Sequence, residues 1–404
     1  MSTDLLYHGF GIHGYEHVAS TFQGNEVTLT IRHKRASHRC SACGCWNVVL
    51  HGQQQRRLRT VPLGPKPVWL AVAIPRVECR NCGVIRQVRL SFADARYSYT
   101  RSFERYVLDL SHAMTIQDVA RHLNVGWDVV KDIQKRNLQR RFKRVKLRDL
   151  QQIAIDEISI GKGHRYVTIV LNLLSGAVVF VGEGKGADAL RPFWQKLKAA
   201  KARIKAVATD MSAAYIQAVQ ENLPKAVHVF DHFHVIKLFN DKFSDFRRQL
   251  YHEAIGPLAK KVLKGTRWLL LKNPENLDPK HNERQRLEEA LRLNQPLATV
   301  YYMKEDLRQI WEQPDKATAR RVFDDWVRRA EAAGIEMLRK FAYTLALGKS
   351  AILAYYDYRI STGPLEGTNN KIRTMQRQAY GFRDYEFFKL KILALHETKY
   401  ALVG

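Results

Sequence analysis

"IAIDEISIG", residues 153–161, places two adjacent carboxylates inside a run that otherwise has the apolar character of a buried β-strand. Aspartate is among the residues that strands least favour, and a buried charge is costly unless it is paired or bound to a metal. Successive side chains of a strand face opposite sides of the sheet, so Asp156 and Glu157 are rivals for any one site. We expect Asp156 to face a polar site and Glu157 to lie on the opposite face or at the rim, paired with a basic residue.

The surrounding sequence predicts a mixed sheet with helices packed on it. Three strands are expected in succession, within residues 151–160, 165–174 and 177–184, and a helix, a strand, a helix and a strand are expected between residues 189 and 234. From about residue 237 to residue 347 the sequence becomes mostly helical and charged. The remaining tail has a Gly-Pro break followed by a long amphipathic helical pattern.

The charge of the chain points to a polyanionic partner. Lys and Arg total 66 against 39 Asp and Glu in 404 residues, a net charge of +27 that is too large for a typical metabolic enzyme. The stretch from Lys131 to Arg148 alone holds nine basic residues and one acidic residue.

No apolar run approaches the length of a membrane span, and the N-terminus lacks the features of a signal peptide. We therefore expect a cytoplasmic protein.

The five cysteines all precede residue 83, and four of them form two CxxCG pairs. Cys40, Cys43, Cys79 and Cys82 supply the four thiolates of a closed tetrahedral zinc site, which predicts one structural Zn²⁺ in a zinc ribbon-like module with short strands. Cys45 or His38 is the alternative for one of these ligands.

Residues 102–142 predict a helix-turn-helix. Ile116, Val119 and Leu123 mark one apolar helix stripe that Thr115 can cap, and a second helix begins near Trp127 after an Asn-Val-Gly turn. A small three-helix bundle would show the same stripes, but the basic run that follows favours DNA, because phosphate contacts need cations beside the reading helix.

Three acids stand where a metal site is expected. Asp156 lies in the first strand, Asp210 ends the fourth strand, and Glu366 opens the helix after the Gly-Pro break. Acids at strand ends and at a helix start can converge at one edge of a sheet, and three carboxylates suit two Mg²⁺ or Mn²⁺ ions that act on a phosphodiester. Any one of these acids taken singly is better explained as a helix cap or a surface ion-pair partner, and the metal site is favoured only when the three are taken together.

Other polar residues are candidates for supporting roles. Asp231 and His234 follow the last strand and are candidates for an auxiliary metal or phosphate contact, or for structural roles. Asn370 shares a helix face with Glu366. It is a candidate either to orient the Glu366 carboxylate or to contact DNA. Trp268, Trp311 and Trp326 could stack on an unpaired base, although core packing is their default role. The residues expected to contact DNA are Trp127, Lys131, Lys135, Arg136, Arg140, Arg141, Lys143, Arg144, Asn370, Lys371, Arg373 and Arg377.

Taken together, these motifs resemble the transposases of bacterial insertion sequences of the ISL3 family. The resemblance rests on the CxxCG pairs, the helix-turn-helix, "IAIDEISIGKGHRYVTIV", "VATDMSAAYIQAV", "VFDHFHVIKLFND" and "GPLEGTNNKIRTMQRQAYGFRDYEFFKLKIL". It implies an α/β catalytic core with an RNase H-like mixed five-stranded sheet, a large helical insertion, and a DDE triad at Asp156, Asp210 and Glu366. The implied domains are a zinc-binding module (1–98), a helix-turn-helix domain with a basic tail (99–149), a catalytic domain (150–236 and 348–404) and the helical insertion (237–347).

The resemblance implies an enzyme that binds the terminal inverted repeats of a mobile element, cleaves the DNA and joins the freed 3′-hydroxyl to a target. We expect a homodimer in the active complex, because two element ends must be held together. The alternatives are a non-catalytic regulator that uses only the zinc module and the helix-turn-helix, and a structure-specific nuclease of the same fold. Loss of cleavage and joining on substitution of any of the three acids would separate the transposase from the regulator, and a failure to join ends would favour the nuclease.

Overall fold

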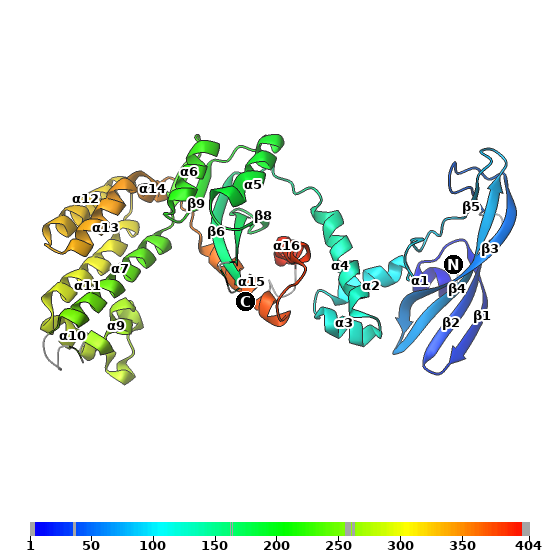
Figure 1. Cartoon of the computed structure of the whole chain (residues 1–404), viewed down its shortest axis with the longest axis horizontal. Coiled ribbons are helices and arrows are strands. Elements are labelled where there is room, and N and C mark those ends of the chain that lie inside the picture. Colours follow the sequence, from blue (N-terminus) through cyan, green and yellow to red (C-terminus); the bar gives the residue numbers. More distant parts are fainter. Residues whose placement is uncertain are drawn as a thin grey trace. The chain divides into compact units, whose positions relative to one another are not determined.

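The computed structural model describes residues 5–34, 38–161, 163, 165–254, 260 and 263–397 (Figure 1). By its internal contacts the chain divides into two units. The first comprises residues 1–143, 378–390 and 397–404, and the second comprises residues 144–377 and 391–396. No helix among the described residues is long and apolar enough to cross a membrane.

The N-terminal module is a five-stranded sheet in the order β1-β2-β4-β3, with β5 paired to β4. Its strands are longer than the short strands expected of a zinc ribbon, because the hairpin of β3 and β4 continues beyond the cysteine loops and buries Leu58, Val68, Leu70 and Val72 in a core of its own. The elements are α1 (Leu5–Phe10), β1 (Tyr15–Gln23), β2 (Glu26–His33), β3 (Val48–Leu63), β4 (Lys66–Cys79) and β5 (Ile85–Gln87).

Three helices form the helix-turn-helix region, in agreement with the sequence prediction: α2 (Arg101–Leu110), α3 (Ile116–Leu123) and α4 (Trp127–Phe142). Thr115 caps α3 by accepting a hydrogen bond from the Asp118 N–H. Asn124 ends α3 with φ of +50°, a left-handed conformation that asparagine tolerates, and α4 starts at Trp127 after this turn. Phe103, Val107, Val119, Val130 and Ile133 form the buried core of the bundle.

Residues 378–390 belong by their contacts to the same unit as this bundle, whereas the sequence assigned them to the catalytic domain. Ion pairs connect this segment to α4. The Nζ atoms of Lys131 and Lys135 on α4 each lie 3.0 Å from Oδ2 of Asp384, and the Nζ atom of Lys135 lies 2.9 Å from Oε2 of Glu386. This segment includes the first part of α16 (Tyr385–Leu393).

The second unit is built on a five-stranded sheet in the order β10-β9-β6-β7-β8. Strands β6, β7 and β8 form an antiparallel meander, and β9 and β10 run parallel to β6. This is the RNase H-like topology. The strands are β6 (Gln152–Gly161), β7 (Arg165–Asn172), β8 (Val178–Glu183), β9 (Ala206–Thr209) and β10 (Val227–Phe230).

Helices cover the two faces of this sheet differently. In Figure 1, α5 (Ala187–Ala200) and α6 (Ala213–Asn222) lie above the sheet, and α15 (Gly363–Gln378) lies below it. Ile153 and Ile155 share a core with Leu190, Phe193 and Tyr215 of α5 and α6. By the two-residue period of a strand, Asp156 therefore points to the face that α15 approaches.

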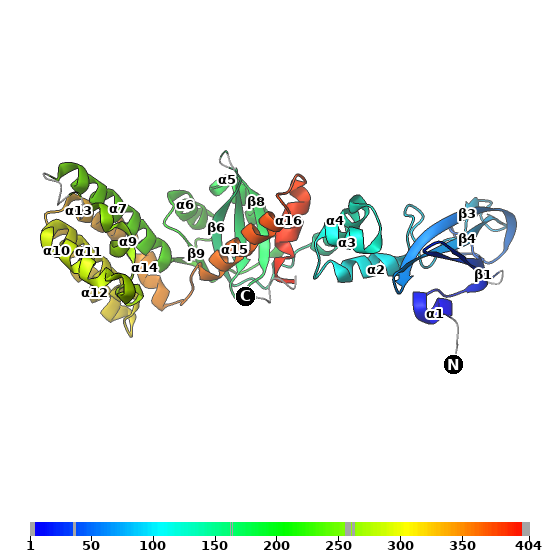
Figure 2. The same ribbon diagram turned by 90° about the horizontal axis from the view of Figure 1, so that it is seen from below.

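The helical region between β10 and α15 has a hydrophobic core of its own, which includes Phe239, Phe243, Trp326, Phe341 and Leu345. Figure 2 shows its main helices gathered into one bundle. The region begins earlier than residue 237, because α7 starts directly after β10. Its helices are α7 (His232–Glu253), α9 (Arg267–Leu271), α10 (Glu283–Leu293), α11 (Gln295–Arg308), α12 (Lys316–Ala332), α13 (Glu336–Leu347) and α14 (Lys349–Leu353).

Candidate active site and DNA-binding surfaces

Asp156 and Asp210 leave the same edge of the sheet. Strands β6 and β9 are parallel and in register, with Ala154 opposite Ala208. Each acid follows two residues later, so the two side chains are on the same face of neighbouring strands, which lie about 4.8 Å apart. The register therefore brings together two carboxylates that are far apart in sequence.

The environment of Asp156 disfavours its negative charge. Burial, with a further contribution from the charge of Asp210, raises the pKa of the Asp156 carboxyl above its usual range. Two hydrogen bonds and a nearby histidine act in the opposite direction: the Glu157 N–H donates to Oδ1 over 2.8 Å, Nδ2 of Asn369 donates to Oδ2 over 2.9 Å, and His234 lowers the pKa through its charge. A bound cation would stabilise the negative charge of a carboxylate in this environment.

Glu157 faces the other side of the sheet, as expected. Its partner is not a basic residue, however, because Oε2 accepts a hydrogen bond of 3.2 Å from the hydroxyl of Tyr215 on α6. Tyr215 is buried in the core beneath α6, and burial raises the pKa of its hydroxyl, which keeps it protonated and able to donate. Glu157 is thus removed from the face that Asp156 shares with Asp210.

Helix α15 is anchored to this edge at two points on either side of Glu366. Before the helix, the Thr362 hydroxyl donates to Oδ2 of Asp231 at the end of β10. One turn after Glu366, Asn369 donates to Asp156 on β6. Because β9 lies between β10 and β6, these anchors carry the first turn of α15 across the end of β9, which Asp210 follows. Glu366, in this first turn, is exposed.

The auxiliary candidates Asp231 and His234 lie at the same edge. Asp231 is opposite Asp210 by the register of β9 and β10, which pairs Phe230 with Thr209, and its side chain is 1 % exposed. Its Oδ1 has no hydrogen-bond partner among the described residues and lies 3.5 Å from Nδ1 of His232. His234, in the first turn of α7, is close enough to Asp156 to favour the carboxylate charge.

Asn369 is a residue that the sequence reasoning missed, because it selected the neighbouring Asn370. Asn369 is 6 % exposed, and its Oδ1 is buried without a hydrogen-bond partner among the described residues. Asn370 is exposed and accepts from Arg373 rather than contacting Glu366. Neighbouring residues of a helix point about 100° apart, so the i+3 position of Glu366 faces the sheet whereas the i+4 position does not. The Asn-Asn pair after Glu366 was the available signal.

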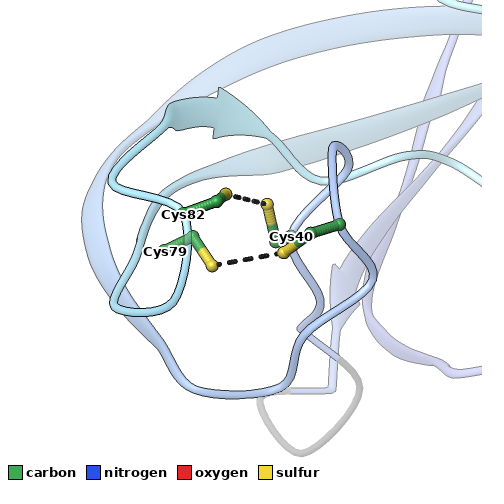
Figure 3. A group of neighbouring side chains, drawn as sticks. Cys40, Cys79 and Cys82 are labelled. Atoms are coloured by element: carbon green, nitrogen blue, oxygen red, sulfur yellow. Dashed lines mark hydrogen bonds between the residues drawn. The ribbon is translucent and has the colours of Figure 1, made fainter.

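The four paired cysteines converge at the other candidate metal centre (Figure 3). The Sγ atoms of Cys40 and Cys82 are 3.7 Å apart, those of Cys43 and Cys79 are 3.5 Å apart, and all four lie within 4.8 Å of one another. Zn–S bonds of about 2.3 Å in a tetrahedron separate sulfurs by roughly 3.8 Å, so the cluster fits a zinc ion. Among the described residues, no other group of three or more His, Cys, Asp or Glu side chains has its ligand atoms within this distance of one another.

Backbone amides support thiolates in this cluster. The N–H groups of Cys43 and Ala42 lower the pKa of the Cys40 thiol to about 6. The Val84 N–H lowers the pKa of the Cys82 thiol, but the other thiols of the cluster and burial together outweigh it and raise this pKa to about 12. A bound cation removes this conflict, since it stabilises all four thiolates together.

Neither alternative zinc ligand belongs to this group. The Sγ atom of Cys45 accepts from the Asn47 N–H over 3.4 Å, and the ring of His38 lies 4.9 Å from the ring of His33.

The basic residues of α4 divide between two faces. Lys131 and Lys135 pair with acids of residues 378–390, and the hydrogen bonds that Lys135 donates to Glu386 and Asp384 raise its pKa. Carboxylates thus neutralise the two lysines of this face. Trp127, at the start of the same helix, is 47 % exposed.

The second face of α4 borders an open groove of about 730 Å³ between α2 and α4. The guanidinium of Arg136 lies 3.8 Å from the ring centre of Tyr97, and that of Arg140 pairs with Glu104 over 2.6 Å. Two further arginines of the groove come from α2 and were not selected from the sequence, because their spacing in a polar helix gave no signal. The five arginines that line it are Arg101, Arg105, Arg136, Arg140 and Arg141.

The DNA-binding residues expected on α15 continue from Glu366. Asn370, Arg373 and Arg377 are exposed and lie within about 40° of Glu366 around the helix axis at 100° per residue. Gln376, on the side of Asn369, donates to the carbonyl of Ile160 on β6 over 3.1 Å, which keeps this stripe turned away from the sheet. A cationic stripe therefore runs along the helix from Glu366.

Two of the three tryptophans of the helical region pack into its core. Trp326 is fully buried and donates to the Met303 carbonyl over 2.8 Å, and Trp311 packs partly buried against the same core. Trp268 is 66 % exposed, so of the three it is the one available to a ligand.

Family models match three consecutive parts of the chain. A model described as "Transposase" matches residues 153–392, the helix-turn-helix domain of transposase family ISL3 matches residues 88–136, and the zinc-finger of transposase IS204/IS1001/IS1096/IS1165 matches residues 36–82.

Known proteins are similar over most of the chain. The transposase for insertion sequence element IS1001 of Bordetella parapertussis is 35% identical over 358 residues, which cover 88% of each chain. The transposase for insertion sequence element IS1557 of Mycobacterium tuberculosis is 28% identical over 388 residues, covering 89% of this chain and 86% of the other. A solved Drosophila P element transposase strand transfer complex aligns with a TM-score of 0.42 and 9% identity, covering 75% of this chain and 92% of that chain.

Proposed function

The chain belongs to the ISL3 family of transposases, and from this premise we propose that Asp156, Asp210 and Glu366 are the carboxylates with which it cuts and joins DNA. It is an enzyme that binds DNA, cleaves it and transfers strands. The observation that carries the assignment of residues is the sheet edge, where Asp156 and Asp210 leave neighbouring parallel strands and α15 is anchored on both sides of Glu366.

The family's chemistry uses divalent metal ions, and we propose that two Mg²⁺ or Mn²⁺ ions are held by these three acids. The donor set fits, because the carboxylates are hard oxygen ligands and the charge of Asp156 is disfavoured by burial and by Asp210. When bound, the ions supply Lewis-acid activation of the attacking oxygen and stabilise the leaving oxygen.

The chain's own residues orient this site. Asn369 and the Glu157 N–H each hold one oxygen of Asp156, so the carboxylate keeps one direction before DNA arrives. Asp231, through Thr362, fixes the entry of α15, and His234 adds a nearby polar group that favours the Asp156 charge. We propose positioning roles for Asn369, Thr362 and Asp231.

The reaction proceeds in two displacements at phosphorus. Hydrolysis breaks a phosphodiester bond at an end of the element and leaves a 3′-hydroxyl. That hydroxyl then attacks a phosphorus of the target strand, the target's own 3′ oxygen leaves with the proton balance restored by solvent, and the element end is joined.

DNA contacts are proposed for α4 and α15. The exposed stripe of Asn370, Arg373 and Arg377 extends from Glu366 and suits phosphates next to the cleaved bond. On the helix-turn-helix, Trp127 and the groove between α2 and α4 present cations beside the reading helix, whereas Lys131 and Lys135 become available when Asp384 and Glu386 are displaced. The proposed ligands of the structural zinc are Cys40, Cys43, Cys79 and Cys82.

Incubation with labelled terminal-repeat DNA and Mg²⁺ tests the function. We expect cleavage at the element end and a joined product, and neither product on DNA that lacks the repeat. A non-catalytic regulator would give no product, and a structure-specific nuclease would cut branched DNA without joining. Those alternatives are not favoured, because the family match covers the catalytic region as well as the DNA-binding region.

We also propose a homodimer in the active complex, since two ends must be held together. Light scattering of the complex with repeat DNA is expected to give two chains and two ends. One chain on one end under joining conditions would contradict the dimer.

A further inference from the structure

The helical region contains a pocket that the catalytic assignment does not use. It has a volume of about 130 Å³ and is lined by Ser244, Arg247 and Arg248 of α7 and by Arg267 of α9. We call these four residues the arginine pocket. The space is several times that needed for one water, so a phosphate group fits within it.

The cations of the arginine pocket are incompletely neutralised. Arg248 pairs with Asp245, but the part of the chain that the structure describes provides no ion pair for Arg247 or Arg267. Nη1 of Arg247 donates to the Leu263 carbonyl over 2.8 Å, whereas its Nε is buried with no hydrogen-bond partner among the described residues.

The clustered guanidinium groups disfavour one another's charge. Burial, together with the charges of Arg267 and Arg248, lowers the pKa of Arg247, which shows that its charge is disfavoured where it stands. The guanidinium of Arg267 lies 4.7 Å from the ring centre of the exposed Trp268, the next residue in the chain. Like charges gathered around one pocket are expected where an anion binds, because the ligand then neutralises them.

We propose that the arginine pocket binds a backbone phosphate of DNA, so that the helical region forms a second DNA contact in addition to the helix-turn-helix and the catalytic edge. Guanidinium groups present paired N–H donors that match phosphate oxygens, and the unpaired Nε of Arg247 supplies one such donor. The proposal rests on the proposed function for the identity of the polymer, but the phosphate chemistry follows from the pocket itself.

The test compares the salt dependence of DNA binding by full-length variants. Arg247→Gln combined with Arg267→Gln is compared with Arg284→Gln combined with Arg320→Gln, two exposed arginines of the same region whose loss changes the net charge equally. Dissociation constants for terminal-repeat duplex are measured by fluorescence anisotropy over a range of salt concentrations. Each lost phosphate contact makes the negative slope of log K against log salt shallower by about 0.9.

We expect the pocket variant to lose affinity by about tenfold and to show a reduced slope, and the control variant to keep the wild-type slope. Equal slopes in all three proteins would overturn the proposal. Should the pocket variant fail to fold, Ser244→Asp tests the same site, because it places a carboxylate in the pocket without removing an arginine, and it is expected to weaken binding in the same way.

An inorganic phosphate arm separates the two sources of the ligand. If phosphate raises the melting temperature of wild-type protein but not of the pocket variant, while DNA slopes are equal, the pocket takes free phosphate and the DNA assignment is wrong. Failure of the proposed function is distinguishable, since it would appear as absent cleavage and joining by wild-type protein even where the pocket variant shows the reduced slope.

Discussion

The cysteine cluster and the carboxylate edge are both suited to cations, but they are built in opposite ways. The cysteines come from two tight loops of one module, and their sulfurs already lie within 4.8 Å of one another. The acids come from two strands and a helix that are far apart in sequence, and the carboxylate of Asp156 is held with its charge disfavoured. The first arrangement leaves no open ligand position, which suits a structural ion. Three carboxylates would leave coordination positions of a bound cation open to water and phosphate oxygens, which suits catalysis.

The largest effect that distinguishes the two centres is expected from the acids. Asp156→Asn, Asp210→Asn and Glu366→Gln should each lower strand cleavage and joining by about a thousandfold or more, because each removes a proposed ligand from the reacting centre. Repeat-DNA binding and zinc content should stay at wild-type levels. Product formation on end-labelled DNA checks the prediction, and near-normal joining by any one variant would remove that residue from the site.

Loss of the other centre should act through folding. Cys79→Ser is expected to lose zinc and to unfold the cysteine loops, because the free energy of zinc binding in such a site is also free energy of folding. Zinc counted by mass spectrometry and proteolysis within residues 38–87 measure this effect. Cys45→Ser is the matched control, since its sulfur lies outside the cluster, and it should keep its zinc.

An intermediate effect on activity is expected from Asn369, which holds one oxygen of Asp156. Asn369→Ala should lower activity by about 10 to 100-fold, the range seen when a residue that orients a metal ligand is removed. The acid limb of the pH–rate profile should also move to higher pH, because the hydrogen bond from Asn369 lowers the pKa of Asp156. Thr374→Ala on the same helix, whose hydroxyl bonds to the Asn370 carbonyl, should change neither. An unshifted profile with reduced rate would indicate a purely structural role.

The smallest effect concerns stability without magnesium. The pKa of Asp156 is raised in the folded chain relative to about 3.9 in the unfolded chain, so the folded state binds more protons between the two values. The free energy of unfolding therefore falls as pH rises through that window. Asp156→Asn should be more stable than wild type at neutral pH, by about 1.4 kcal/mol for each unit of the shift.

Urea unfolding in magnesium-free buffer measures this difference, which should shrink as the pH approaches 4. A variant that is less stable than wild type at neutral pH would contradict the account of the charge at Asp156.

Local patterns predicted much of this organisation. The cysteine pairs, the start of α4 at Trp127 and the meander of β6 to β8 follow from spacing and periodicity within short windows. The choice between Asp156 and Glu157 required the face of the sheet, which depends on the packing of α6 through Tyr215.

Long-range pairing was beyond the reach of such patterns. The selection of Asn370 instead of Asn369 turned on a rotation of about 100° around α15, which only the contact with Asp156 fixes. The pairing of Lys131 and Lys135 with Asp384 joins segments that no sequence window contains together. The two arginines of α2 could not be assigned to a groove from the sequence, because the groove exists only where α4 packs opposite them.

Counting both kinds of ion in the same samples tests the central claim most directly. Zinc is measured by mass spectrometry and bound Mn²⁺ by electron paramagnetic resonance, in the presence of repeat DNA. The account predicts one zinc and two manganese ions per wild-type chain, loss of manganese alone in Asp156→Asn combined with Asp210→Asn, and loss of zinc in Cys79→Ser. The account would be contradicted if the double aspartate variant still bound manganese, or if it lost its zinc along with its manganese.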